Sequence, residues 1–242
     1  MKNTLVKYLV ATLGLFFVAV GIALSIISNL GTSPLSCPAY VLNLRIPGIS
    51  VGTFTWLVNL LYVFVQLAVL RKRFRAKYLM QIVASIVFGA LIDASLWMFS
   101  WLHPTGFAQR FGVAVVSCLV SALGVSIEVV ARGWMLSAEM TVYSFVKAYG
   151  FEFGKTKVVM DSLVVVISAA LSLIFFRNPL GNGEFTSFWD AVLASSGESV
   201  IGIGTLLSAV SVGWLMKFTD PLADWFMNRF VIPDPEKDGM EY

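Results

Sequence analysis

Acidic side chains occur inside the long apolar stretches of this 242-residue chain, where an ionised group is costly. Asp161 lies one turn into an apolar segment, Glu128 lies inside another, and Asp93 lies deep within "FGALIDASLW". A charge at the centre of a membrane helix costs ~3 kcal/mol on insertion scales, and such residues commonly form proton relays or line solute paths. The sequence therefore predicts that Asp93, Glu128 and Asp161 serve proton or ion coupling.

Two of these acids have a base four residues away, which leaves a purely structural interpretation open. Lys157 precedes Asp161 by four residues, and Arg132 follows Glu128 by four. Residues at this spacing are neighbours on one helix face and form ion pairs there. Asp93 has no such base, so a buried hydrogen bond or a proton relay is the expectation for it.

The stretch "ISNLGTSPLSCPAYVLN", residues 27–43, joins two apolar runs without a single charge. A loop in water would hold charged residues, and a membrane helix would avoid Gly31 and two close prolines. Irregular backbone at membrane depth is tolerated where protein or a water-filled cavity satisfies its polar groups. We therefore predict a re-entrant or broken half-helix here and a second one at its counterpart "WMLSAEMTVY", residues 134–143. The first would be capped by Thr32 or Ser33 with Pro34 in its first turn. Its amides would face a central site, and an interfacial loop with a short surface helix is the alternative.

Composition places the chain among integral membrane proteins. Hydrophobic residues make up 58% and charged residues only 13% of the sequence, and the mean hydropathy is +0.83. A net charge of +3 without a basic stripe argues against nucleic-acid partners. Cys37, Cys118 and His103 have no metal-ligand spacing, so we expect no metal and no cofactor. Without a catalytic cluster or a phosphate-binding loop, we do not expect an enzyme.

Hydropathy predicts an all-α protein with six transmembrane helices, each near the roughly 20 residues that a bilayer requires. A short amphipathic helix at 218–230 and a solvated tail follow the last of them. With the N-terminus inside, fourteen Lys and Arg residues fall on the cytoplasmic side and three outside, which predicts cytoplasmic N- and C-termini. The predicted spans are 6–28, 52–70, 78–101, 109–131, 157–176 and 194–216.

The chain also aligns with itself. Residues 21–42 align without gaps on 124–145, which pairs Ser36 with Glu139, and a later block pairs Asn59 with Asp161. Each copy holds three spans, an odd number, so the copies would be inverted-topology repeats of the kind common in secondary transporters. The expected parts are an N-terminal repeat at 1–104, a C-terminal repeat at 105–217 and an interfacial helix and tail at 218–242. Candidate substrate-binding residues near the repeat interface are Thr32, Ser33, Ser36, Asn59, Glu139 and Asp161.

Three short motifs resemble the YczE/YyaS/YitT-type bacterial membrane proteins: Gly31-Thr32-Ser33-Pro34, Gly52, and Gly202-Ile203-Gly204-Thr205. The resemblance implies a six-span protein of the bacterial inner (cytoplasmic) membrane, often guessed to transport. Members commonly follow the first motif with Trp-Asp, whereas this chain has Leu35 and Ser36. Since the internal alignment sets Glu139 opposite Ser36, the acidic role is expected in the other half.

The favoured function is a secondary transporter of a small polar or anionic solute, with proton coupling as an option. Its partners would be the lipid bilayer and a small-molecule solute, and a homo-oligomer or a protein partner stays open. A non-transporting membrane partner or regulatory subunit is one alternative. A passive channel is the other, although buried carboxylates argue mildly against it.

Overall fold

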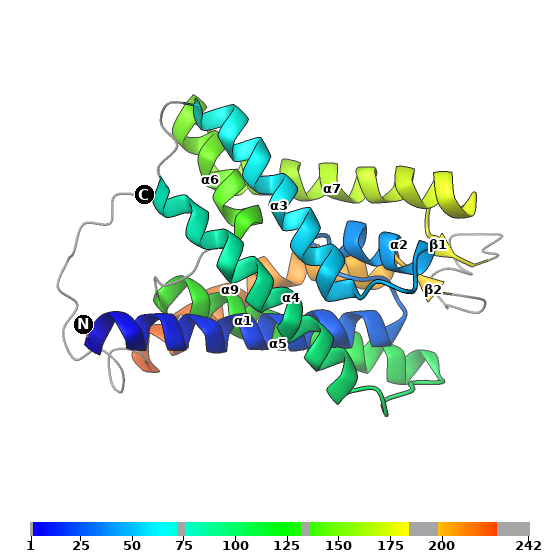
Figure 1. The fold of residues 1–242 in the computed structure, drawn as a ribbon. Helices are drawn as coiled ribbons and strands as arrows, with labels where there is room; N and C mark the ends of the chain where they lie inside the picture. The colour runs from blue at the N-terminus through cyan, green and yellow to red at the C-terminus, as the bar shows by residue number, and fades with distance from the viewer. Residues whose placement is uncertain (1, 72–75, 132–135, 184–197, 227–242) are drawn as a thin grey trace.

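The computed structural model describes residues 2–71, 76–131, 136–183 and 198–226, and these are almost entirely helical (Figure 1). A 3-10 turn, η2 (Ala76–Leu79), precedes α4, and the two-residue strands β1 (Gly181–Asn182) and β2 (Glu198–Ser199) pair antiparallel. The predicted all-α class is confirmed. The helices are α1 (Lys2–Ser28), α2 (Cys37–Arg45), α3 (Val51–Leu70), α4 (Met80–Met98), α5 (Phe107–Ala131), α6 (Ser137–Tyr149), α7 (Phe153–Phe176) and α9 (Ile203–Phe226).

Five of these helices are long and apolar enough to cross a membrane, so the chain is a multi-pass membrane protein. Their bounds agree with the first five predicted spans to within a few residues. They are Val6–Ser28, Val51–Leu70, Met80–Met98, Phe107–Ala131 and Lys155–Phe176.

The last helix differs from its predicted span of 194–216. α9 begins at Ile203, and its apolar part, Ile203–Val212, is shorter than a full span. Residues 194–197 lie outside the described part. The helix continues without a break through Phe226, so the described portion of the predicted interfacial helix, 218–226, belongs to α9 itself.

Two helices are too short to cross a bilayer. α2 has 9 residues and α6 has 13, which correspond to about 14 Å and about 20 Å against a hydrocarbon thickness of ~30 Å. Both short helices pack against α3 and α7, and α6 also touches α4. Each short helix follows the first long helix of its half, α1 or α5 (Figure 1).

The most extensive helix–helix contact in the bundle is between α1 and α5. α4 packs against α1, and α9 packs against α5. Glycines set the spacing at this crossing: a Cβ added at Gly14 would lie 2.8 Å from Glu128 N and 2.9 Å from Gly124 O. α3 and α4 cross in the same way, because a Cβ on Gly52 would overlap the Gly89 carbonyl oxygen. Around these crossings lies an apolar core that includes Leu15, Ile22, Val41, Phe88 and Ile92.

Candidate functional site

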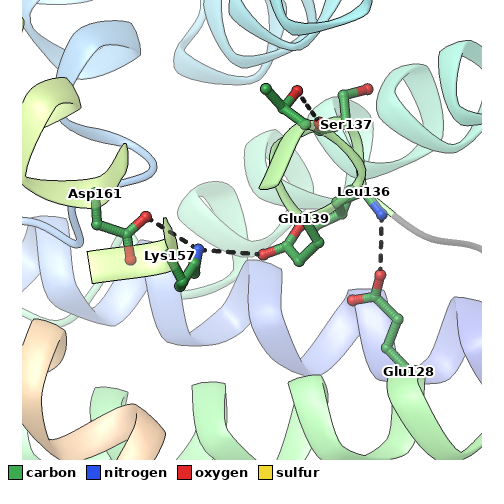
Figure 2. A network of polar contacts seen from close by, with 7 residues as sticks. Glu128, Leu136, Ser137, Glu139, Lys157 and Asp161 are labelled. Atoms are coloured by element: carbon green, nitrogen blue, oxygen red, sulfur yellow. Dashed lines mark hydrogen bonds and ion pairs between the residues drawn. The ribbon is translucent and has the colours of Figure 1, made fainter. Parts of the chain in front are cut away.

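Glu128 lies on α5 at the point where the chain turns back to begin α6. Its side chain is buried, with only 6% of the residue exposed. Oε1 accepts a hydrogen bond of 3.2 Å from the backbone N–H of Leu136, the residue before α6 (Figure 2). The amides of a first helical turn have no partner within their own helix, and the positive end of the helix dipole favours a carboxylate. Glu128 therefore holds the N-terminal end of α6 against α5.

Lys157 lies between two further carboxylates. Its Nζ is 3.0 Å from Asp161 Oδ1 and 3.6 Å from Glu139 Oε1 (Figure 2). The pair with Asp161 is the predicted ion pair along α7, whereas Glu139 belongs to the first turn of α6. A left-handed Gly150 (φ 73°) ends α6 and lets the chain turn into α7, which brings these residues together.

The four ionisable residues, Glu128, Glu139, Lys157 and Asp161, form what we name the acidic cluster. Among the described residues it contains three carboxyl groups and one ammonium group, which pairs with Glu139 and Asp161, whereas Glu128 accepts from the Leu136 amide. Glu139 Oε2 is buried and has no hydrogen-bond partner among the described residues. Buried polar atoms are nearly always paired, and an unpaired one is costly. The cluster therefore has room for a proton or another positively charged or donating group.

A network of amides and hydroxyls fixes the beginning of α6 against α3 and α4. The side chains of Gln66 and Gln81 bond each other in both directions, at 3.0 Å and 2.8 Å. Gln66 Nε2 also donates to Ser137 O at 3.0 Å and to Thr141 Oγ1 at 3.2 Å. Ser85 Oγ lies 3.2 Å from Ser137 Oγ. Gln66 and Gln81 were not among the predicted site residues, although two carboxamides inside apolar spans were a usable signal.

The candidates Thr32, Ser33 and Ser36 lie together in the irregular segment before α2. Thr32 Oγ1 and Ser33 Oγ are each 2.8 Å from Ser36 Oγ, and Ser25 Oγ on α1 donates to Thr32 Oγ1 at 3.3 Å. We name these four residues the hydroxyl cluster. Thr32 and Ser36 are fully buried, and their hydroxyls form hydrogen bonds within the cluster.

The backbone of this segment is satisfied by the residues that lead into α9. Thr32 N donates to Val200 O at 2.9 Å, and Gly204 N donates to Leu30 O at 2.7 Å. Gly31 has a φ of +101°, and an added Cβ there would overlap Gly202 N, so only glycine fits. The protein itself thus supplies the partners that irregular backbone needs at depth.

The start of α2 differs from its prediction. The helix begins at Cys37, and Ser36 occupies the N-cap position without a side-chain capping bond. The amides of Ser36 and Cys37 instead donate to the Ser33 carbonyl oxygen, at 3.0 Å and 3.1 Å. The predicted side-chain cap by Thr32 or Ser33 is therefore wrong, because a backbone turn takes its place.

Asn59 and Asp161, which the internal alignment pairs, have different surroundings. Asn59 is 1% exposed, and its Nδ2 donates to Thr55 O at 3.0 Å within α3. It lines a small gap beside Ile82 and Ser85 of α4, and its Oδ1 has no hydrogen-bond partner among the described residues. Asp161 belongs to the acidic cluster on α7.

Asp93 binds the beginning of α3. Its Oδ1 accepts from Gly52 N at 2.8 Å and its Oδ2 accepts from Ser50 Oγ at 2.6 Å. The side chain thus anchors α4 to the positive end of α3. Asp93 thus forms hydrogen bonds apart from the acidic cluster, but the expectation that they are buried is wrong, because Asp93 is only half-buried and Ser50 is exposed.

A family of unknown function, DUF6198, matches residues 5–221 of the chain. No curated protein matches the chain, and no solved structure matches it. The resemblance to YczE/YyaS/YitT-type proteins stays a prediction.

Proposed function

Because the chain belongs to DUF6198, a family whose function is unknown, we propose a function from the site: a proton-coupled secondary transporter of a small polar or anionic solute, in which the acidic cluster couples protons to movement. One observation carries the proposal. In a multi-pass membrane protein, Lys157 is shared by Glu139 and Asp161 beside the buried Glu128. Ionisable residues within membrane segments commonly serve substrate or proton pathways.

The cluster connects a protonation state to the position of one helix. An ionised Glu128 accepts the Leu136 amide in a charge-assisted bond, which holds α6 to α5. A proton on Glu128 removes that charge and weakens the bond. A proton on Glu139 leaves Lys157 to Asp161 alone and weakens the contact between α6 and α7. Since both acids act on α6, the number of bound protons biases where this helix lies.

The order of the helices supports an inverted repeat of residues 1–104 and 105–217. Each half runs long, short, long, long: α1, α2, α3, α4 and then α5, α6, α7, α9. Two sets of contacts follow the same relation: within the halves α1 contacts α4 as α5 contacts α9, and between the halves α2 contacts α7 as α6 contacts α3. In this proposal α9 is the sixth span, α2 and α6 are the half-helices, and both termini lie in the cytoplasm of a bacterium.

The test is solute-driven proton movement in liposomes that contain the purified protein and a pH-sensitive dye. We expect at least one member of a panel of small polar and anionic metabolites to move protons. Glu128→Gln keeps an oxygen for the Leu136 amide but cannot ionise, so it should lower the coupled proton flux at least a hundredfold.

The matched control is Glu152→Gln. Glu152 pairs with Lys155 at 2.7 Å on the surface, with the two side chains 66% and 82% exposed respectively, and the variant should keep the full rate. An unchanged proton flux in Glu128→Gln, with the solute still transported, would refute coupling at this cluster. A panel in which no solute moves protons would refute the proposal as a whole.

A further inference from the structure

A narrow space between α3 and α4, which we name the α3–α4 gap, lies within the apolar part of both helices. Two buried polar atoms of its lining residues have no hydrogen-bond partner among the described residues: Trp56 Nε1, and Oδ1 of Asn59, which is 1% exposed. Such atoms are nearly always paired, because an unpaired one keeps its full desolvation cost. These two are complementary, since the indole N–H donates and the amide oxygen accepts. The gap is lined by Trp56, Asn59, Leu60, Val63, Ile82 and Ser85.

The α3–α4 gap is closed in this structure, and the helices are held together at both of its ends. At one end Gly52 touches Gly89, and Asp93 accepts hydrogen bonds from the beginning of α3. At the other end Gln66 and Gln81 bond each other in both directions. The space between these ends has no room for a water molecule. A molecule can therefore satisfy the two unpaired atoms only when α3 and α4 separate.

The corresponding helices of the second half are arranged differently. α3 packs closely against α4, whereas α7 packs against α2, α6 and β1 and makes no extensive contact with α9 among the described residues. The same two elements of a repeat are thus packed together in one half and apart in the other. Alternating access moves one repeat relative to the other. An exchange of the two arrangements, which rests on the proposed function, separates α3 from α4.

From these observations we infer that the opened α3–α4 gap is a solute site, and that its solute is a small neutral polyol. One hydroxyl group can accept from Trp56 Nε1 and donate to Asn59 Oδ1, because residues three apart lie on the same helix face. Ser85 Oγ donates to Gln81 O at 2.7 Å and keeps accepting capacity for a second hydroxyl.

The lining of the α3–α4 gap distinguishes a neutral solute from an anion. The residues that line it include no charged side chain in the described part of the chain. A charge without a partner is costly in such apolar surroundings. The inference therefore narrows the solute of the proposed transporter from polar or anionic to neutral and hydroxylated.

The two ends of the α3–α4 gap differ in their access to solvent. Ser50 is exposed and Asp93 is half-buried, whereas Gln66 is 0% and Gln81 4% exposed. The solute therefore enters from the end that Asp93 closes.

The first test is calorimetric titration of the purified full-length protein with glycerol, erythritol, xylitol and mannitol. Lactate, which has a hydroxyl and a negative charge, is the anionic comparison. We expect at least one polyol to bind and lactate to bind more weakly than that polyol.

Two variants remove the unpaired atoms one at a time. Trp56→Phe keeps an aromatic ring without the N–H, and Asn59→Leu keeps a similar shape without the amide. Each should weaken polyol binding about tenfold. Trp97→Phe is the matched control for the indole, since Trp97 on α4 is 81% exposed, and it should bind normally.

The melting temperature without solute distinguishes a binding role of Asn59 from a structural one. Asn59→Leu should raise it by about 2–4 °C, because no buried oxygen is left unpaired. Gln66→Leu is the matched change at a paired carboxamide, and it should lower the melting temperature because Gln81 loses its partner.

A reversible cross-link tests the separation of the helices. Ser50→Cys combined with Asp93→Cys can be joined by a short bis-methanethiosulfonate, since Ser50 Oγ lies 2.6 Å from Asp93 Oδ2. The native Cys37 and Cys118 are buried. The cross-linked protein should not bind the polyol, and dithiothreitol should restore binding.

No polyol bound by the folded protein would overturn the inference, and so would tighter binding of lactate than of every polyol. A lower melting temperature of Asn59→Leu with unchanged binding, or full affinity in the cross-linked protein, would also overturn it. Polyol binding without coupled proton flux would refute the proposed transport and leave the site standing. Coupled flux of an anionic solute, with no polyol bound, would do the reverse.

Discussion

The hydroxyl cluster of the first half and the acidic cluster of the second lie at positions that the internal alignment pairs, Ser25 with Glu128 and Ser36 with Glu139. A hydroxyl both donates and accepts hydrogen bonds, so Ser25, Thr32, Ser33 and Ser36 satisfy one another. An ionised carboxylate only accepts, so Glu128 depends on a backbone amide and Glu139 on Lys157. The hydroxyl cluster is therefore closed and neutral, whereas the acidic cluster can change its charge and its contacts.

The largest effect should come from Gly31→Ala, which tests how tightly the first half is closed. The new methyl group would meet Gly202 N, and the φ of +101° is unfavourable for alanine. Overpacking and strain together should cost about 3 kcal/mol of unfolding free energy, measured by unfolding in SDS.

Gly150→Ala is the matched variant in the second half. It has φ +73° with nothing within 4 Å of an added Cβ, so strain alone should cost about 1 kcal/mol. Equal losses at the two glycines would contradict the view that the first half is the more rigid one.

Lys157→Met should have the next largest effect, because it leaves Glu139 and Asp161 without their base. Breaking a buried ion pair costs ~3–5 kcal/mol. Since side-chain exposures of 31% for Lys157 and Asp161 and 23% for Glu139 admit solvent, we expect about 2 kcal/mol in the same assay.

Adding Glu139→Gln and Asp161→Asn to Lys157→Met should recover most of that loss, since no unpaired charge remains. Lys155→Met, at a pair on the surface, should change little. A triple variant as unstable as Lys157→Met would mean that packing of the lysine chain, and not charge, holds this region.

Glu128→Ala should cost about 1 kcal/mol, the usual loss for a removed helix cap, and Glu128→Gln should cost less because the amide oxygen still accepts from Leu136. Ser25→Ala, at the paired position, removes only the bonds to Thr32 and Gly31. Thermal unfolding of the three variants at two pH values sharpens the comparison. The Ser25→Ala loss should be the same at both, since no hydroxyl in its cluster titrates near neutral pH.

The smallest expected effect is at Cys37, beside the hydroxyl cluster. Burial raises the pKa of this thiol from 9.0 to about 12. Stability from the protonated thiol is therefore fully present below about pH 9 and falls as the pH rises towards 12. In a Cys118→Ala background, maleimide should label Cys37 in SDS but barely in the folded protein at pH 9. Rapid labelling of the folded protein would contradict a closed first half.

Hydropathy was sufficient for the first five spans, because an apolar run of that length has few alternatives. The start of the last helix was mispredicted for a physical reason. The backbone groups before Ile203 form hydrogen bonds with distant segments and not within a helix. Val200 N donates to Leu180 O, and Val200 O accepts from Thr32 N. Such pairing depends on distant segments, and hydropathy carries no information on it.

The candidate site was predictable only where its geometry is local. Helical spacing predicted the contact between Lys157 and Asp161, and that contact is present. The bond from Leu136 to Glu128 and the contact of Lys157 with Glu139 were not predicted. Both depend on where α6 lies between α5 and α7. The hydrogen bonds of Gln66 with Ser137 and with Gln81 fix that position.

The glycine crossing of α1 and α5 also limits how this molecule can move. At Gly14 and Gly124 the two backbones touch without intervening side chains, since an added Cβ on Gly124 would lie 2.6 Å from Val18 N. Sliding either helix by one residue would drive a side chain into that contact. We therefore expect α1 and α5 to keep their position relative to each other. Any alternating motion would then occur in α3, α4, α6 and α7. In the proposed transporter, a disulfide between α1 and α5 would then leave turnover intact, whereas one between α6 and α7 would stop it.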